Sequence, residues 1–313
     1  MMHCIVFSKD RAMQVHATLQ SFFAHCKEAD DLRVTILYKC SSEQHARQYL
    51  ELAQLWGSHT NVVFTRQSHF RRDVVRILSP FRKGSLRYRF SLTATMIPAR
   101  MIRFISKYQP LKGEVGKVLF LVDDTIFTAD FSIANIEKTL DNNRDALGFS
   151  LRLGKNTRYC YMMDRKQPQP EFTSPADGIL KFNWTKSELD FAYPLEVSSS
   201  IYRLAELFPL LLRVNFNNPN YLEGGLVRFV GQFVASHPML LCYDTSVAFC
   251  NPVNLVQTVS LNNRVSSNKK YTVDELAALF DSGWVINTRS FGHVIPESCH
   301  QEMDLTFEKR EAK

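Results

Sequence analysis

Short apolar runs alternate with longer amphipathic segments over roughly the first fifth of the chain. The runs at residues 3–7, 33–38 and 61–65 are rich in β-branched and aromatic side chains, which is typical of strands. Between them, apolar residues recur at helical spacing over residues 13–25 and 44–56. This alternation predicts an α/β protein with a Rossmann-like, mostly parallel central sheet flanked by helices.

A fourth strand pattern, in KVLFLVDDTIFTAD at residues 117–130, ends on two adjacent carboxylates. Residues 118–122 are continuously apolar, as in a strand buried on both faces, and Asp123 and Asp124 follow at once. In open α/β sheets, ligands bind at the carboxyl ends of the strands, where oxygen ligands suit Mg²⁺ or Mn²⁺. The alternative is an ordinary turn with two solvated aspartates.

The second half of the chain predicts a looser, mixed α/β arrangement. We expect a strand at residues 146–153, a polar loop at 154–178, and helices at 200–212 and 222–234. Thr272 and Glu275 have capping-box spacing, which predicts a helix that ends near residue 280. We divide the chain into residues 1–130, a nucleotide-binding half, residues 131–305, an acceptor-binding and catalytic half of the same domain, and residues 306–313, a flexible tail.

Charge is unevenly spread along the 313 residues, whose net charge is +7. Residues 66–107 hold eleven Lys and Arg against the single acid Asp73, which favours an anionic partner such as a diphosphate, an anionic lipid surface, an acidic glycan or nucleic acid. We expect a helix at residues 85–108, interrupted near Pro98. The seven cysteines form no C-x-x-C pair, and neither a membrane span nor a secretory signal is visible. A cytoplasmic protein is therefore expected.

Four features, taken in order, resemble GT-A-type glycosyltransferases, most of all uncharacterised bacterial members. They are the turn from Ser8 to Arg11 after the first strand, the carboxylate pair in FLVDDTIF, the later NNPNYLEGGL, and a C-terminal stretch with His300. The resemblance implies a GT-A fold and transfer of a sugar from a nucleoside diphosphate sugar to a hydroxyl of a glycan or lipid-linked acceptor. It further implies assistance by Mn²⁺ or Mg²⁺ and a role in bacterial surface polysaccharide synthesis.

The resemblance also assigns roles at the nucleotide end of the site. The family's D-x-D motif reads Val122-Asp123-Asp124 here, so its first carboxylate is replaced by valine. Asp124 matches the metal-binding position and Asp123 the position near the ribose or donor sugar. Ser8 and Arg11 fall in the loop that frames the nucleotide. His300 is the candidate second ligand for the metal or the diphosphate, and His293 is the alternative.

Glu223 is the candidate catalytic residue, as general base or as a carboxylate beside the anomeric carbon. It also suits the first turn of a helix, where a carboxylate complements the dipole. Candidate partners of the diphosphate come from the basic segment: Arg71, Arg72, Lys83 and Arg87.

Two other functions are compatible with the pattern. A nucleotidyltransferase on a related sheet would also use carboxylates and Mg²⁺, although SKDRAMQ is not a Gly-rich phosphate loop. A non-catalytic protein could bind through the basic residues, but no recognised nucleic-acid motif is present, so nucleic acid is not expected. A basic face could also hold the enzyme at the inner membrane face.

Overall fold

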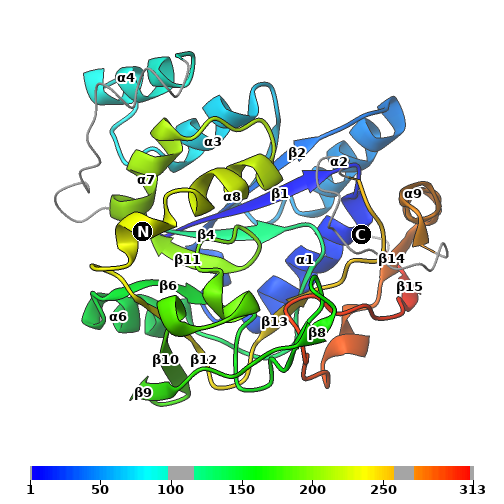
Figure 1. Ribbon diagram of the computed structural model, residues 1–313. Coiled ribbons are helices and arrows are strands. Elements are labelled where there is room, and N and C mark those ends of the chain that lie inside the picture. Colours follow the sequence, from blue (N-terminus) through cyan, green and yellow to red (C-terminus); the bar gives the residue numbers. More distant parts are fainter. Residues whose placement is uncertain (1, 98–115, 257–270, 311–313) are drawn as a thin grey trace.

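A computed structural model describes residues 2–97, 116–256 and 271–310. Its centre is a nine-stranded sheet that takes strands from both halves of the chain (Figure 1). In spatial order the strands are β3 (Val62–Arg66), β2 (Arg33–Lys39), β1 (His3–Lys9), β4 (Lys117–Val122), β11 (Ser200–Arg203), β6 (Ala146–Ser150), β12 (Met239–Tyr243), β10 (Ile179–Asn183) and β9 (Phe172–Ala176).

The sheet is mostly parallel, as predicted. Its described strands run in one direction except β11 and β10, which pair antiparallel with their neighbours on both sides. Three two-stranded ribbons lie outside it: β5 (Thr125–Phe127) with β13 (Ala248–Cys250), β7 (Tyr159–Cys160) with β8 (Arg165–Lys166), and β14 (Trp284–Ile286) with β15 (Phe307–Lys309).

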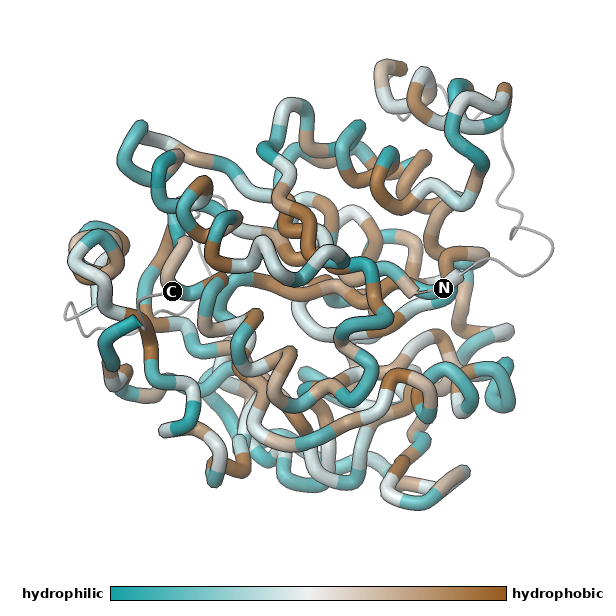
Figure 2. The backbone as a smooth tube through the Cα atoms, turned by 180° about the vertical axis from the view of Figure 1, so that it is seen from behind, coloured by the Kyte–Doolittle hydropathy of each residue, from teal (hydrophilic) through white to brown (hydrophobic). Residues whose placement is uncertain are grey.

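Helices cover both faces of the sheet. They are α1 (Ala12–His25), α2 (Glu43–Leu55), α3 (Phe70–Leu78), α4 (Leu86–Ala94), α6 (Ile133–Asn142), α7 (Leu204–Arg213), α8 (Pro219–Val227) and α9 (Val273–Asp281). Helices α3, α7 and α8 share one hydrophobic core with the sheet, whereas α1, α2, α6 and α9 share the other. Figure 2 shows the resulting hydrophobic interior strands between more hydrophilic peripheral segments.

The central strands alternate between these two cores. In β1, Cys4 and Val6 belong to one core and Ile5 and Phe7 to the other, and β4 alternates in the same way. Burial on both faces explains why these runs are continuously apolar. It also fixes the register of β1 beside β4, so that the residues after each strand emerge at the same sheet edge.

Three predicted elements were wrong. Residues 200–203 form β11 instead of the start of a helix, because they lie buried between β4 and β6, and α7 begins only at Leu204. The polar loop at residues 154–178 contains three short strands. The predicted helix at 222–234 begins earlier and ends earlier, because Asn218 caps α8 by accepting from the Tyr221 N–H and Pro219 takes its first position.

Other expectations hold in part. The strand expected at 146–153 ends at Ser150, the helix expected from residue 85 ends at Ala94, and residues 307–309 of the expected flexible tail form β15, which pairs with β14. Thr272 and Glu275 form the predicted capping box of α9. Ser85 caps α4, and the part of that predicted helix from residue 98 onward lies outside the described residues. The cysteines are unpaired and all but Cys40 are buried. Within the described ranges, we find no helix with the length and apolar character needed to cross a bilayer.

Candidate active site

A cavity of about 1250 Å³ opens at the carboxyl ends of β1 and β4. Its walls come from both halves of the chain, including the β1–α1 turn, α3, the segment after β6, the turn before β11, and α8. Seven of the residues predicted for the site from the sequence line this one cavity: Ser8, Arg11, Arg71, Asp123, Asp124, Glu223 and His300. The sequence motifs therefore meet in space although they lie far apart along the chain.

Asp123 is buried and holds the turn after β1. Its carboxylate accepts hydrogen bonds from the Ser8 hydroxyl at 2.9 Å, the Lys9 main-chain N–H at 3.2 Å and Arg11 Nη1 at 2.8 Å. The Ser8 hydroxyl is also bonded to the Tyr49 hydroxyl of α2. Asp123 thus orders the loop that faces the cavity.

The backbone of this turn has an unusual, left-handed conformation at Asp10. Its φ of 59° lies in the left-handed region, which aspartate tolerates better than most residues. The Asp10 carboxylate accepts from the Ser41 N–H at 2.7 Å and so ties the turn to the end of β2. The Arg11 side chain that follows is held by Asp123, Asp124 and the main-chain oxygen of Asn254.

Asp124 and Asp123 both pair with the guanidinium of Arg11. The Arg11 Nη1 atom lies 3.3 Å from the Asp124 carboxylate. Burial raises the pKa of Asp124, and the positive charges of Arg11 and Arg152 act in the opposite direction. One arginine therefore bridges both carboxylates of the pair, and the alternative of two solvated aspartates in a turn is wrong.

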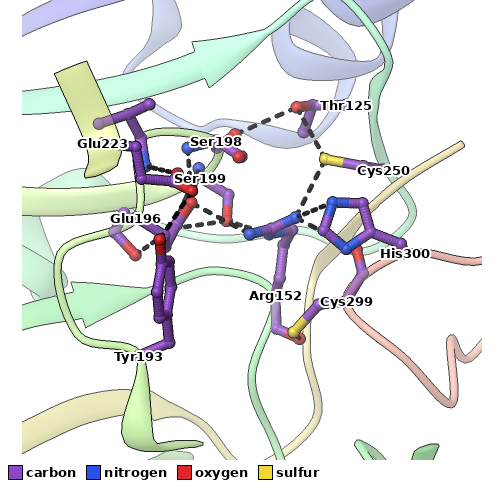
Figure 3. Close-up of polar contacts among 12 residues, drawn as sticks. Thr125, Arg152, Tyr193, Glu196, Ser198, Ser199, Glu223, Cys250, Cys299 and His300 are labelled. Carbon is purple, nitrogen blue, oxygen red and sulfur yellow. Dashed lines mark hydrogen bonds and ion pairs between the residues drawn. The ribbon is translucent and has the colours of Figure 1, made fainter. Parts of the chain in front are cut away.

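Arg152 is the centre of a second buried polar cluster (Figure 3). Its Nε donates to the Ser199 hydroxyl at 2.7 Å, and its Nη2 donates to Glu196 at 3.0 Å. On the other side, Nη1 donates to Cys250 Sγ at 3.2 Å and to His300 Nε2 at 3.3 Å. The Arg152 and Glu196 side chains are only 5% and 9% exposed, so the pair is shielded from solvent.

His300 is held neutral by this environment. Burial, followed by the charge of Arg152, lowers the pKa of His300 to about 3. Because a guanidinium can only donate, the Nε2 atom of His300 acts as an acceptor toward Arg152. The lone pair that a metal would need is thus directed at an arginine.

Glu223 projects from α8 toward Tyr193 and the turn before β11 (Figure 3). Its carboxylate accepts from the Val197 N–H at 2.9 Å and from the Tyr193 hydroxyl at 3.1 Å. Burial, followed by the negative charge of Glu196, raises the pKa of Glu223 to about 7. Since α8 begins at Pro219, Glu223 lies in the second turn, and the expectation of a first-turn position was wrong.

Arg71 supplies a positive charge in the cavity wall. Its guanidinium donates to the main-chain oxygen of Leu212 at 2.8 Å and to those of Thr95 and Ile97 at 3.3 Å each. Its buried Nε has no hydrogen-bond partner within the described ranges. The other three predicted diphosphate partners, Arg72, Lys83 and Arg87, do not line the cavity.

Sequence reasoning did not identify Arg152 as part of the site. The available signal was an arginine inside the otherwise apolar run ALGFSLRL, where an unpaired charge would be costly. Lys9, which donates from Nζ to the main-chain oxygen of Val256 at 3.2 Å, is a second cavity-lining cation that was missed.

Comparison with known proteins gives one informative match. The chain is 22% identical over 311 aligned residues to the bifunctional glycosyltransferase pgtA of Dictyostelium discoideum, and the match covers 92% of this chain. The chain spans 36% of the length of that relative. No family model matches the chain.

The solved structures that resemble this chain do so with low TM-scores. TarS of S. aureus in complex with UDP-GlcNAc is 16% identical, with 69% of this chain and 54% of that chain covered and a TM-score of 0.36. The mannosyltransferase PcManGT from Pyrobaculum calidifontis, in complex with GDP-Man and Mn²⁺, is 12% identical, with 53% and 42% covered and a TM-score of 0.29. The similarity to the curated relative over nearly the whole chain confirms the predicted resemblance to glycosyltransferases.

Proposed function

We propose that this protein is a glycosyltransferase that moves a sugar from a nucleoside diphosphate sugar to an acceptor hydroxyl. The observation that carries the proposal is the single cavity that joins the Arg11-bridged carboxylates to Glu223. The donor would lie over the turn after β1, near Ser8, Arg11 and Asp123. The acceptor would approach from the side of α8.

Glu223 is the proposed general base. A carboxylate with a pKa of about 7 is poised to take a proton near neutral pH. As it removes the acceptor proton, the acceptor oxygen bonds to the anomeric carbon. The bond from that carbon to the diphosphate breaks, and the leaving diphosphate keeps the electron pair. This single displacement inverts the anomeric centre; a product with retained configuration would instead make Glu223 a carboxylate beside the anomeric carbon.

Positive charge near the leaving diphosphate would lower the barrier, because negative charge develops there in the transition state. The cavity offers Arg11, Lys9 and Arg71 for this role. Among the described residues, Arg11 and Arg71 each keep a buried Nε without a hydrogen-bond partner, which is costly until a ligand reaches it.

The carboxylates around Asp124 provide some, but not all, of the ligands that a divalent cation needs. Three carboxylates, those of Asp123, Asp124 and Glu196, face the two guanidinium groups of Arg11 and Arg152, so one negative charge has no counterpart in this cluster. Among the described residues, no three His, Cys, Asp or Glu side chains form a ready metal cluster. We propose that Asp124 holds Mn²⁺ or Mg²⁺ together with the diphosphate of the donor, an arrangement that Mg²⁺ often uses. His300 would join only if its contact with Arg152 opened.

When bound, such a metal neutralises charge on the leaving group. The acceptor class, a glycan or a lipid-linked glycan, and the role in bacterial surface polysaccharide synthesis stay predictions from the resemblance. No feature of the cavity favours a nucleotidyltransferase over this proposal.

The test is nucleotide binding by calorimetry and thermal shift. Uridine, guanosine, cytidine and thymidine diphosphates are compared with and without Mn²⁺ on the wild type, Asp124→Ala and Asp177→Ala. Asp177 is exposed in the turn between β9 and β10 and is the matched control. We expect one nucleotide to bind with metal enhancement that Asp124→Ala loses and Asp177→Ala keeps. Absence of binding by every nucleotide would overturn the proposal.

A further inference from the structure

Helix α4 and the turn after it present large apolar side chains to solvent. Leu86 is 84% exposed, Phe90 is 63% exposed, and Met96, just after the helix, is 74% exposed. Leu86 and Phe90 are four residues apart and therefore lie on the same helix face. Beside them is an apolar groove of about 360 Å³, lined by Phe81, Leu86, Arg87, Phe90, Ser91 and Leu212. We call the exposed apolar and basic residues of this segment the α4 surface: Arg82, Lys83, Leu86, Arg87, Arg89, Phe90 and Met96.

The same surface is strongly basic. Arg82, Lys83, Arg87 and Arg89 are all exposed. The sequence contains no Asp or Glu between Asp73 and Glu114, and Asp73 is already bonded to Arg76 and to the turn before α3. The positive charge of the α4 surface is thus not balanced by acidic residues nearby in the chain.

The position of α4 leaves this surface accessible. Figure 1 shows α4 at the margin of the molecule, beyond α3 and away from the central sheet. It is nevertheless connected to the cavity, because Arg71 in the cavity wall donates to the main-chain oxygens of Thr95 and Ile97 at its end. A partner on the α4 surface would therefore be near one wall of the candidate active site.

We propose that the α4 surface docks onto an anionic membrane. Exposed leucine and phenylalanine side chains can enter the boundary between headgroups and acyl chains, while arginine and lysine bind anionic headgroups. The combination of exposed apolar and basic residues favours a membrane over two other candidate partners, nucleic acid and a second copy of this chain. Nucleic acid would use the charges without needing the apolar residues. A symmetric second copy would bring the same basic residues face to face and repel itself.

This inference is independent of the proposed function, because its test measures membrane binding directly. Full-length protein is mixed with phosphatidylcholine vesicles with and without phosphatidylserine, at low and high salt, and the bound fraction is measured by co-sedimentation. The variants are Leu86→Ser with Phe90→Ser, and Arg87→Glu with Arg89→Glu. The matched controls are Leu50→Ser, a 60% exposed leucine on α2, and Arg165→Glu with Lys166→Glu, an exposed basic pair on β8.

We expect binding to vesicles with phosphatidylserine to exceed binding to phosphatidylcholine alone by about tenfold or more, and to weaken with salt. Both α4 variants should reduce it by about fivefold or more, and both controls should retain it. Thermal unfolding of each variant shows that loss of binding is not loss of fold.

Three results would overturn the inference. They are no preference of the wild type for anionic vesicles, retention of binding in both α4 variants, or a dimer in light scattering that the apolar variant alone disrupts. Nucleotide binding by the same variants should equal that of the wild type, so a failure here stays distinct from a failure of the proposed transferase activity.

Discussion

At the scale of single residues, two neighbouring glutamates have different surroundings. Glu196 is paired with Arg152 and accepts from the Ser199 hydroxyl and N–H, so its charge is well compensated. Burial, followed by the charge of nearby Glu196, raises the pKa of Glu223 to about 7, and its two neutral donors oppose this rise only in part. Differences of this kind separate a structural carboxylate from a proton acceptor in an active site.

The pKa of Glu223 predicts the pH dependence of transfer. A base must be ionised, and the ionised fraction of a carboxyl group rises as pH rises through its pKa. We expect kcat/KM to be level above about pH 7.5 and to fall about tenfold per pH unit well below pH 7. Initial rates across this range, on the best donor, check it.

The matched substitution is Glu223→Gln, which keeps the shape of the side chain and an oxygen that can accept the hydrogen bond from the Val197 N–H. It should lower kcat by about 10²–10⁴-fold and remove the acid limb. Glu188→Gln, at an exposed position outside the cavity, should change neither kcat nor the fall in rate at low pH. A wild-type rate independent of pH from about pH 5 to 8 would rule out Glu223 as the base.

The Arg152–Glu196 pair predicts a large stability effect. Replacing Arg152 by Met would leave the buried charge of Glu196 without its ionic partner, which typically costs about 3–5 kcal/mol. The Lys155–Asp244 pair has side chains 57% and 49% exposed, and Lys155→Met should cost less than about 1 kcal/mol. Urea unfolding of the two variants measures both costs; equal costs would contradict the assigned role of the buried pair.

At the scale of elements, the close approach of α8 to the chain after α7 positions Glu223. A Cβ at Gly225 would lie 2.0 Å from Val214 Cγ1, whereas a Cβ at Gly224 would have no heavy atom within 4 Å. Only a residue without a side chain allows α8 to pack this closely. The glycine pair in LEGGL therefore has one packing position and one open position.

Alanine at these two positions should act in opposite directions. Gly225→Ala forces α8 away from Val214, so we expect lower stability by about 1–3 kcal/mol and weaker transfer. Gly224→Ala should raise stability by up to about 1 kcal/mol, because alanine favours the helix. Thermal and urea unfolding distinguish them, and a neutral Gly225→Ala would show that α8 does not depend on this contact.

Elements whose pattern follows from local burial could be predicted from the sequence. Strands β1, β2 and β4, with the two carboxylates after β4, follow from apolar runs buried on two faces, and β3 follows from a β-branched run at the edge of the sheet. Residues 200–203 were misassigned because their strand state depends on insertion between β4 and β6, which local periodicity does not report. Arg152 was missed for the same reason, since its partners Glu196 and His300 lie 44 and 148 residues away along the chain.

At the scale of the whole molecule, one sheet joins the two halves and creates the cavity between them. The turn after β1 and the carboxylates after β4 face α8 and the turn before β11 across that cavity. A donor bound at one wall and an acceptor at the other would meet over Asp124 and Glu223. The α4 surface lies at the margin of this arrangement, where docking would not obstruct the sheet.

The most direct test of this account is transfer itself. Purified protein with Mn²⁺ is given a panel of uridine, guanosine, cytidine and thymidine diphosphate sugars and mixed glycan acceptors, and both nucleoside diphosphate release and sugar attachment are measured. The account predicts acceptor-dependent release from one nucleotide class, lost in Glu223→Gln and retained in Glu188→Gln. Lack of release from every donor, or release that Glu223→Gln leaves unchanged, would contradict it.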